Sequence, residues 1–149
     1  MQLRFTKGAG KTDAMEVIRA DGSSESIDCP KQGIIPHDMV HFAVEDGLRV
    51  RGFIGRVANG EAASFHMEAE AQSDGVERLV EVMQGDGWSG GTTPPAEMID
   101  LYRVTCDARG CPMLPVGAAE ILAIRARIAA LTQAWAAVPV GGVLELGLA

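Results

Sequence analysis

Residues 36–45 read Pro36-His37-Asp38-Met39-Val40-His41-Phe42-Ala43-Val44-Glu45, and the chain is organised around this stretch. Proline suits the first position of a helix, where its missing N–H costs nothing, and an aspartate in the first turn suits the helix dipole. At about 100° per residue, the polar residues fall within one sector and the apolar residues occupy most of the opposite side. Gly47 then provides a C-terminal stop. The stretch predicts a short amphipathic helix with a polar stripe made of His37, Asp38, His41 and Glu45.

The polar stripe has the residue types and the spacing of a metal site. Histidines at positions i and i+4 of a helix point the same way and can bind one zinc ion, and Glu45 lies one turn further along the same line. Asp38 stands where His-Glu-x-x-His proteases carry their general base, although its side chain is one methylene shorter. The stripe therefore offers His37, His41 and Glu45 as candidate zinc ligands and Asp38 as a candidate catalytic base.

A solvated surface would carry the same stripe, because any amphipathic helix needs a polar face. On that interpretation both histidines face water and titrate independently near their ordinary pKa of about 6.5. Spacing is only part of what a tetrahedral zinc site demands, so the sequence favours the solvated face over the metal site. The third histidine, His66, either completes a site with the other two or lies exposed.

Two resemblances to known families rest on this region. A family of ubiquinone-biosynthesis proteins has a His-Asp-x-x-His zinc motif with a glutamate twelve residues further on, but Phe53 stands at that position here. Residues 35–45, 52–55 and 134–141 are similar to segments of a family of small uncharacterised bacterial proteins. That wider resemblance implies an intact small domain of a recurring type, and it implies no activity.

Composition limits the classes of function. At 149 residues and 47% hydrophobic content, the chain fits one domain, residues 1–149, with a sizeable core. A net charge of -7 disfavours binding to nucleic acid and to anionic membranes, since both need clustered Lys and Arg. Residues 1–7 lack the apolar core of a signal peptide, and three cysteines fit a reducing compartment better than a disulfide framework. These features indicate a cytoplasmic protein.

The glycine-rich stretch Gly8-Ala9-Gly10-Lys11-Thr12 only partly matches a phosphate-binding loop. The full pattern requires a glycine where Phe5 stands, and a helix that begins at the Lys-Thr pair. Residues 15–19 instead have the composition of a strand, which leads into a hairpin turn at 20–23. The stretch is therefore expected to be a flexible turn, not a nucleotide site.

Periodicity elsewhere predicts further strands at 2–6, 24–28 and from residue 143, and helices within 48–58, 76–83, 96–105 and 115–138. Gly52 and Gly55 would let the second helix approach the first closely, whereas Gly85 and Gly87 would end the third. Residues 85–95 then form a long loop around Trp88 that acts as a lid or is pinned to the core. The longest helix has an apolar seam made of Ile121, Ile124, Ile128, Leu131 and Trp135.

These elements predict an α+β domain in which the N-terminal strands and the C-terminal strand form a small antiparallel sheet against a helical middle region. An unpaired terminal strand would pair between chains, which would make a homodimer. The favoured function is a small cytoplasmic binding or structural domain without catalysis, acting on an unidentified protein or small molecule. The alternative is a metal-dependent, hydrolase-like protein, with zinc as the candidate metal, His37, His41 and Glu45 as ligands and Asp38 as base.

Overall fold

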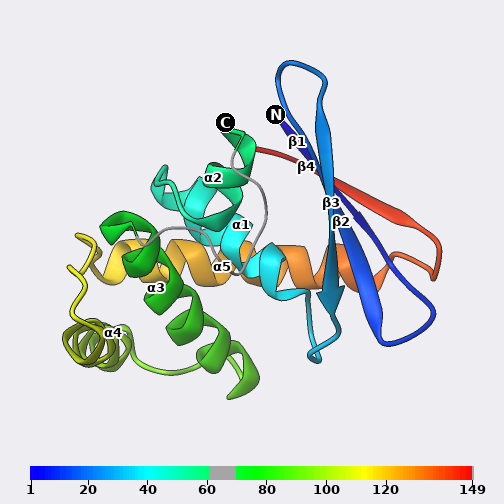
Figure 1. Cartoon of the computed structure of the whole chain (residues 1–149). Helices are drawn as coiled ribbons and strands as arrows, with labels where there is room; N and C mark the ends of the chain where they lie inside the picture. Colours follow the sequence, from blue (N-terminus) through cyan, green and yellow to red (C-terminus); the bar gives the residue numbers. More distant parts are fainter. Residues whose placement is uncertain (61–69, 149) are drawn as a thin grey trace.

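The computed structural model describes residues 1–60 and 70–148, and within them an antiparallel sheet lies beside a group of helices (Figure 1). The strands are β1 (Gln2–Thr6), β2 (Thr12–Ile18), β3 (Ser24–Pro30) and β4 (Val143–Gly147). The helices are α1 (His37–Leu48), α2 (Phe53–Ala58), α3 (Ala71–Trp88), α4 (Pro95–Arg109) and α5 (Ala118–Ala136). The predicted α+β class is confirmed.

The sheet joins the two ends of the chain. Its strand order is β3-β2-β1-β4, and every neighbouring pair is antiparallel. Phe5 of β1 stands opposite Met15 on one side and Leu144 on the other. Alternate residues of β1 and β2 are fully buried because one face of the sheet packs on the helices, as the period-two pattern predicts. The expected pairing of the C-terminal strand with the N-terminal strands is therefore confirmed.

Helix α5 connects the helical side of the molecule to the sheet (Figure 1). Four residues of its predicted seam are buried and Ile128 is half-buried, so the seam packs on the core of its own chain. Near the end of the helix, the ring of Trp135 lies edge-on to Phe5 of β1, with 6.5 Å between the ring centroids. This contact ties the longest helix to the centre of the sheet.

The prediction for Gly85 and Gly87 is wrong. Helix α3 continues through both glycines to Trp88, and the backbone N–H of Ser89 still bonds to the carbonyl of Gly85 at 3.1 Å. Each glycine costs a helix roughly 1 kcal/mol, but burial of Met83 and the ion pair of Asp86 with Arg125, on the same turns, offset that cost. The connection to α4 is consequently short, and Trp88 is the last residue of a helix, not the centre of a long loop.

The stretch from Gly8 to Thr12 joins β1 to β2, and the strand that was expected after it is confirmed. The N–H of Gly8 donates a hydrogen bond to Oδ1 of Asp13 at 2.9 Å, and this bond stabilises the turn.

Among the described residues, no helix combines the length and the apolar character that crossing a bilayer would require.

Candidate metal centre

The polar stripe of α1 is largely buried. His41 is 2% exposed and Glu45 is 1% exposed, because α2 and α3 pack over this side of the helix. His37, at the start of α1, keeps about a third of its side chain in solvent. The interpretation of the stripe as a solvated face is therefore wrong for its central residues, and their polar atoms need partners inside the protein.

Helix α3 supplies a carboxylate between the two histidines. Oε2 of Glu77 lies 2.9 Å from Nε2 of His41, and Oε1 of Glu77 lies 3.4 Å from Nε2 of His37. One potential ligand atom from each of the three residues lies within 4.8 Å of the other two. Ligand atoms bound to zinc at about 2.0–2.1 Å in a tetrahedron are separated by about 3.3 Å, so these three groups already stand close to ligand spacing. We call His37, His41 and Glu77 the metal triad.

The other ring nitrogen of each histidine has its own acceptor. Nδ1 of His41 lies 3.2 Å from Oε2 of Glu45, and Nδ1 of His37 lies 3.0 Å from Oε1 of Gln84. A carboxylate and an amide oxygen can only accept, so both Nδ1 atoms carry the proton and donate it. Both Nε2 atoms then face Glu77. This is how protein histidines are commonly oriented to bind a metal through Nε2.

The N-terminal end of α2, with the preceding Gly52, holds Glu45 in place. Oε1 of Glu45 accepts the N–H groups of Gly52 at 2.7 Å and Gly55 at 2.8 Å, and Oε2 accepts that of Ile54 at 3.1 Å. A Cβ atom on Gly52 would stand only 2.9 Å from the carboxyl carbon, so the expected close approach of α2 to α1 occurs here. The structure thus places the predicted ligand Glu45 behind His41, where it orients the imidazole, and Glu77 completes the triad.

Asp38 points toward the sheet and does not join the metal triad. Its Oδ2 lies 3.3 Å from Sγ of Cys29 on β3, so the thiol donates to the carboxylate. Burial raises the pKa of the Cys29 thiol, and the neighbouring Asp38 raises it further. The candidate base therefore has a partner of its own, on a different side of α1 from the triad.

The triad is electrostatically coupled. Burial alone would lower the pKa of His41, but hydrogen bonds to Glu45 and Glu77 and the charges of both carboxylates outweigh it and raise the pKa to about 10. The hydrogen bond to Glu77 raises the pKa of His37. Burial would raise the pKa of Glu77, but the two histidines lower it well below its usual range. Without a metal, a proton on Nε2 of His41 therefore occupies the position that a metal ion would take.

The triad has an open side. The side chains of His37 and Glu77 are each 35% exposed, whereas His41 is buried beneath them. A bound ion would have three protein ligands and room for water on the solvent side, which is the arrangement of catalytic zinc sites.

Sequence reasoning missed Glu77 and Gln84. Both lie on α3 at positions between the apolar residues that face the core, so they belong to that helix's polar side. No local pattern shows that α3 packs its polar side against the histidines of α1. His66, considered as a third histidine, lies outside the described residues. Comparisons with protein-family models, with curated proteins and with solved structures found no match.

Proposed function

We propose that the protein binds one divalent transition-metal ion, zinc in the first instance, at the metal triad of His37, His41 and Glu77. One observation carries the proposal. Both histidines donate Nδ1–H to a fixed acceptor, so that both Nε2 atoms face the same carboxylate. Imidazole and carboxylate groups suit zinc and its neighbours among the transition metals.

Charge balance supports a divalent ion. The carboxylates of the buried Glu45 and the partly exposed Glu77 both contact the imidazole of His41, and two unbalanced negative charges at a buried imidazole would be costly. With neutral imidazoles, a 2+ ion cancels both charges. Two imidazolium ions would cancel them equally well, so a protonated, metal-free network is the competing state. Metal binding must displace protons from this network, which makes it depend on pH.

A metal-dependent hydrolase is the second candidate, favoured by the partial exposure of His37 and Glu77. Zinc with an open position lowers the pKa of its bound water to about 7 and supplies a hydroxide nucleophile. Asp38 could act as the base only if its side chain gave up the hydrogen bond from the Cys29 thiol and turned toward the triad. The exposed side of the triad is the side from which a substrate would approach.

The experiment that tests metal binding is a competitive zinc titration with a chromogenic chelator, on protein purified without an affinity tag. We expect one zinc ion per chain, with binding lost in His41→Gln and in Glu77→Gln. Glu81→Gln is the matched control, because Glu81 is an exposed residue one turn further along α3, paired with Arg78. Absence of micromolar zinc binding, or equal binding by Glu77→Gln and wild type, would contradict the proposal.

The hydrolase candidate needs a separate test. Zinc-loaded protein is assayed with p-nitrophenyl acetate and with bis(p-nitrophenyl) phosphate, and Glu77→Gln and Glu81→Gln are compared at equal zinc. Turnover that requires zinc and is lost only in Glu77→Gln would support the hydrolase. A protein that binds zinc and hydrolyses neither ester would exclude hydrolysis of these two ester classes and leave metal binding intact.

A further inference from the structure

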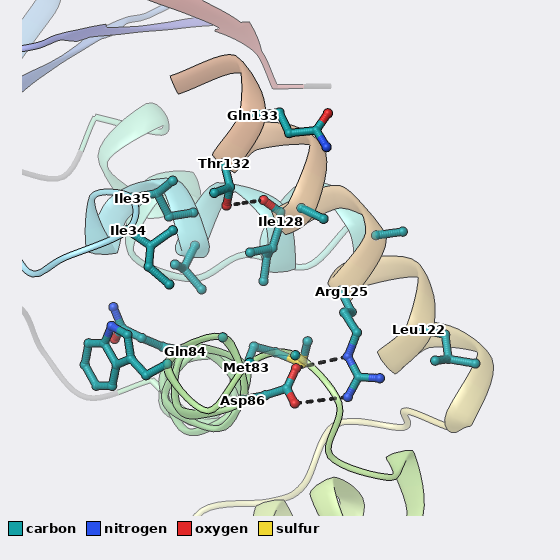
Figure 2. A pocket seen from close by; sticks show the side chains of 17 residues that line it. Ile34, Ile35, Met83, Gln84, Asp86, Leu122, Arg125, Ile128, Thr132 and Gln133 are labelled. Carbon is teal, nitrogen blue, oxygen red and sulfur yellow. Dashed lines mark hydrogen bonds and ion pairs between the residues drawn. The ribbon is translucent and has the colours of Figure 1, made fainter. Parts of the chain in front are cut away.

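A second concave site lies beside the metal triad, between the segment that precedes α1, the C-terminal half of α3, and α5 (Figure 2). Its volume is about 610 Å³, within the range of pockets that hold small organic molecules. Figure 2 shows Ile34 and Ile35 on one wall, Met83 on α3, and Ile128 on α5 facing the same space. We call this site the apolar pocket.

The charged residues of the apolar pocket neutralise each other. Asp86 and Arg125 form a two-point ion pair, with Nε to Oδ2 at 3.0 Å and Nη2 to Oδ1 at 3.1 Å (Figure 2). Thr93 completes the arrangement, because its N–H donates to Asp86 and its carbonyl accepts from Arg125. A charged ligand would lose its hydration without gaining an unpaired opposite charge from these two residues.

The other polar groups of the pocket are neutral. On the side chains they are the amides of Gln84 and Gln133, the indole N–H of Trp88 and the hydroxyl of Thr132, which donates to the carbonyl of Ile128 at 2.7 Å. Three apolar side chains at the pocket keep large exposed fractions: Trp88 58%, Leu122 49% and Ile34 45%. The site therefore combines apolar walls and an exposed indole with a few neutral hydrogen-bonding groups.

We propose that the apolar pocket binds an uncharged, mainly apolar small molecule that carries a neutral hydrogen-bonding group such as a hydroxyl or a carbonyl. The concave shape and the volume favour a small molecule over a second copy of the chain, whose contact surface would have to protrude into the pocket. The pocket favours an uncharged ligand, because its walls are mainly apolar and its two charged residues, Asp86 and Arg125, are paired with each other.

Gln84 connects this pocket to the metal triad. Its side chain lines the pocket, and its Oε1 accepts a hydrogen bond from the Nδ1–H of His37. A molecule in the pocket therefore stands one residue away from a metal ligand. The pocket proposal does not require the metal, since the residues that line the pocket do not include His37, His41 or Glu77.

The test uses octan-1-ol as the probe, with octanoate and octylammonium as charged counterparts of equal chain length. Trp88 reports occupancy, because the other tryptophan, Trp135, is buried. We expect octan-1-ol to shift the tryptophan emission to the blue in a saturable way, and both ions to bind at least about tenfold more weakly. No saturable shift up to the solubility limit, or equal binding of the three probes, would overturn the proposal.

Two substitutions on α5 locate the binding site. Ala126 is exposed and lines the pocket, whereas Ala130 is exposed on the same helix and does not line it. We expect Ala126→Phe to weaken octan-1-ol binding at least about tenfold by filling the pocket, and Ala130→Phe to leave it unchanged, with both variants melting like wild type. Equal effects of the two variants would place the probe elsewhere and overturn the proposal. Self-association of wild-type protein that is lost in Ala126→Phe would also overturn it, because the occupant would then be a second copy.

Discussion

Nδ1 of His41 lies 3.2 Å from Oε2 of Glu45, one helical turn further along α1. The same carboxylate accepts hydrogen bonds from three backbone N–H groups, those of Gly52 and of the first turn of α2, and these bonds hold it against the imidazole. Glu45 therefore fixes both the tautomer and the orientation of a buried histidine, and Nε2 of that histidine is left directed at Glu77.

Glu45→Gln should weaken zinc binding by about 10- to 100-fold without abolishing it, the usual effect of losing the partner of a ligating histidine. The cause is that an amide is a poorer acceptor for Nδ1–H and can present its NH₂ group to the ring. The measurement is competitive zinc titration, with Glu81→Gln as control. An unchanged zinc affinity would show that Glu45 does not support the site.

Gly52→Ala should destabilise the protein by about 1–3 kcal/mol, as overpacking typically does. The added Cβ would stand 2.6 Å from Cγ1 of Val76 and 2.9 Å from Cδ of Glu45. Urea unfolding measures the loss. Gly10→Ala is the control, because none of the described residues comes within 4 Å of its added Cβ, and its effect should stay within about 0.5 kcal/mol. Similar effects of the two substitutions would contradict the close contact between α1 and α2.

Gly85→Ala should stabilise the protein by about 0.5–1 kcal/mol, since position 85 lies within α3 and its added Cβ meets no atom within 4 Å in the part of the chain that the structure describes. Gly90→Ala should instead destabilise it, because Gly90 has φ 102°. Urea unfolding of both variants checks the pair. A destabilising Gly85→Ala would mean that α3 ends before residue 85.

The metal-free protein should lose stability as the pH rises above neutrality. The pKa of His41 is raised from 6.5 to about 10, so its contribution is complete below pH 6.5 and is lost as the pH approaches 10. The protein should also lose stability as the pH falls below 4.5, the ordinary pKa of Glu77, because the pKa of Glu77 is lowered in the folded state. Melting temperatures between pH 6.5 and about 9 should fall in wild type and fall less in His41→Gln. Equal slopes would show that His41 is not held as an imidazolium.

The sequence predicts those elements whose pattern is local. Alternating residues define β1, and the spacing from Ile121 to Trp135 defines α5, because one face of each element must be apolar whatever covers it. The pairing of β4 with β1 follows because a terminal strand needs partners for its backbone groups.

The metal triad could be predicted only in part. The i, i+4 spacing identifies His37 and His41, but Glu77 is 36 positions beyond His41 and joins them only through the packing of α3 on α1. Glu45 has the right spacing for a ligand, yet backbone N–H groups from residues 52–55 hold it behind the ring. The end of α3 was predicted wrongly at Gly85 and Gly87, because tertiary packing of the helix outweighs the low helix propensity of glycine.

The most direct test of the metal triad is a long-range ¹H–¹⁵N correlation spectrum of the histidine rings, recorded with and without one equivalent of zinc. We predict that the Nε2 resonances of His37 and His41 shift on zinc addition while their Nδ1 atoms stay protonated, because Gln84 and Glu45 accept hydrogen bonds from the two Nδ1–H groups. The same spectra of Glu77→Gln should not respond to zinc, and those of Glu81→Gln should respond like wild type. Rings of His37 and His41 that stay unchanged at one equivalent of zinc, or that coordinate it through Nδ1, would contradict the metal triad.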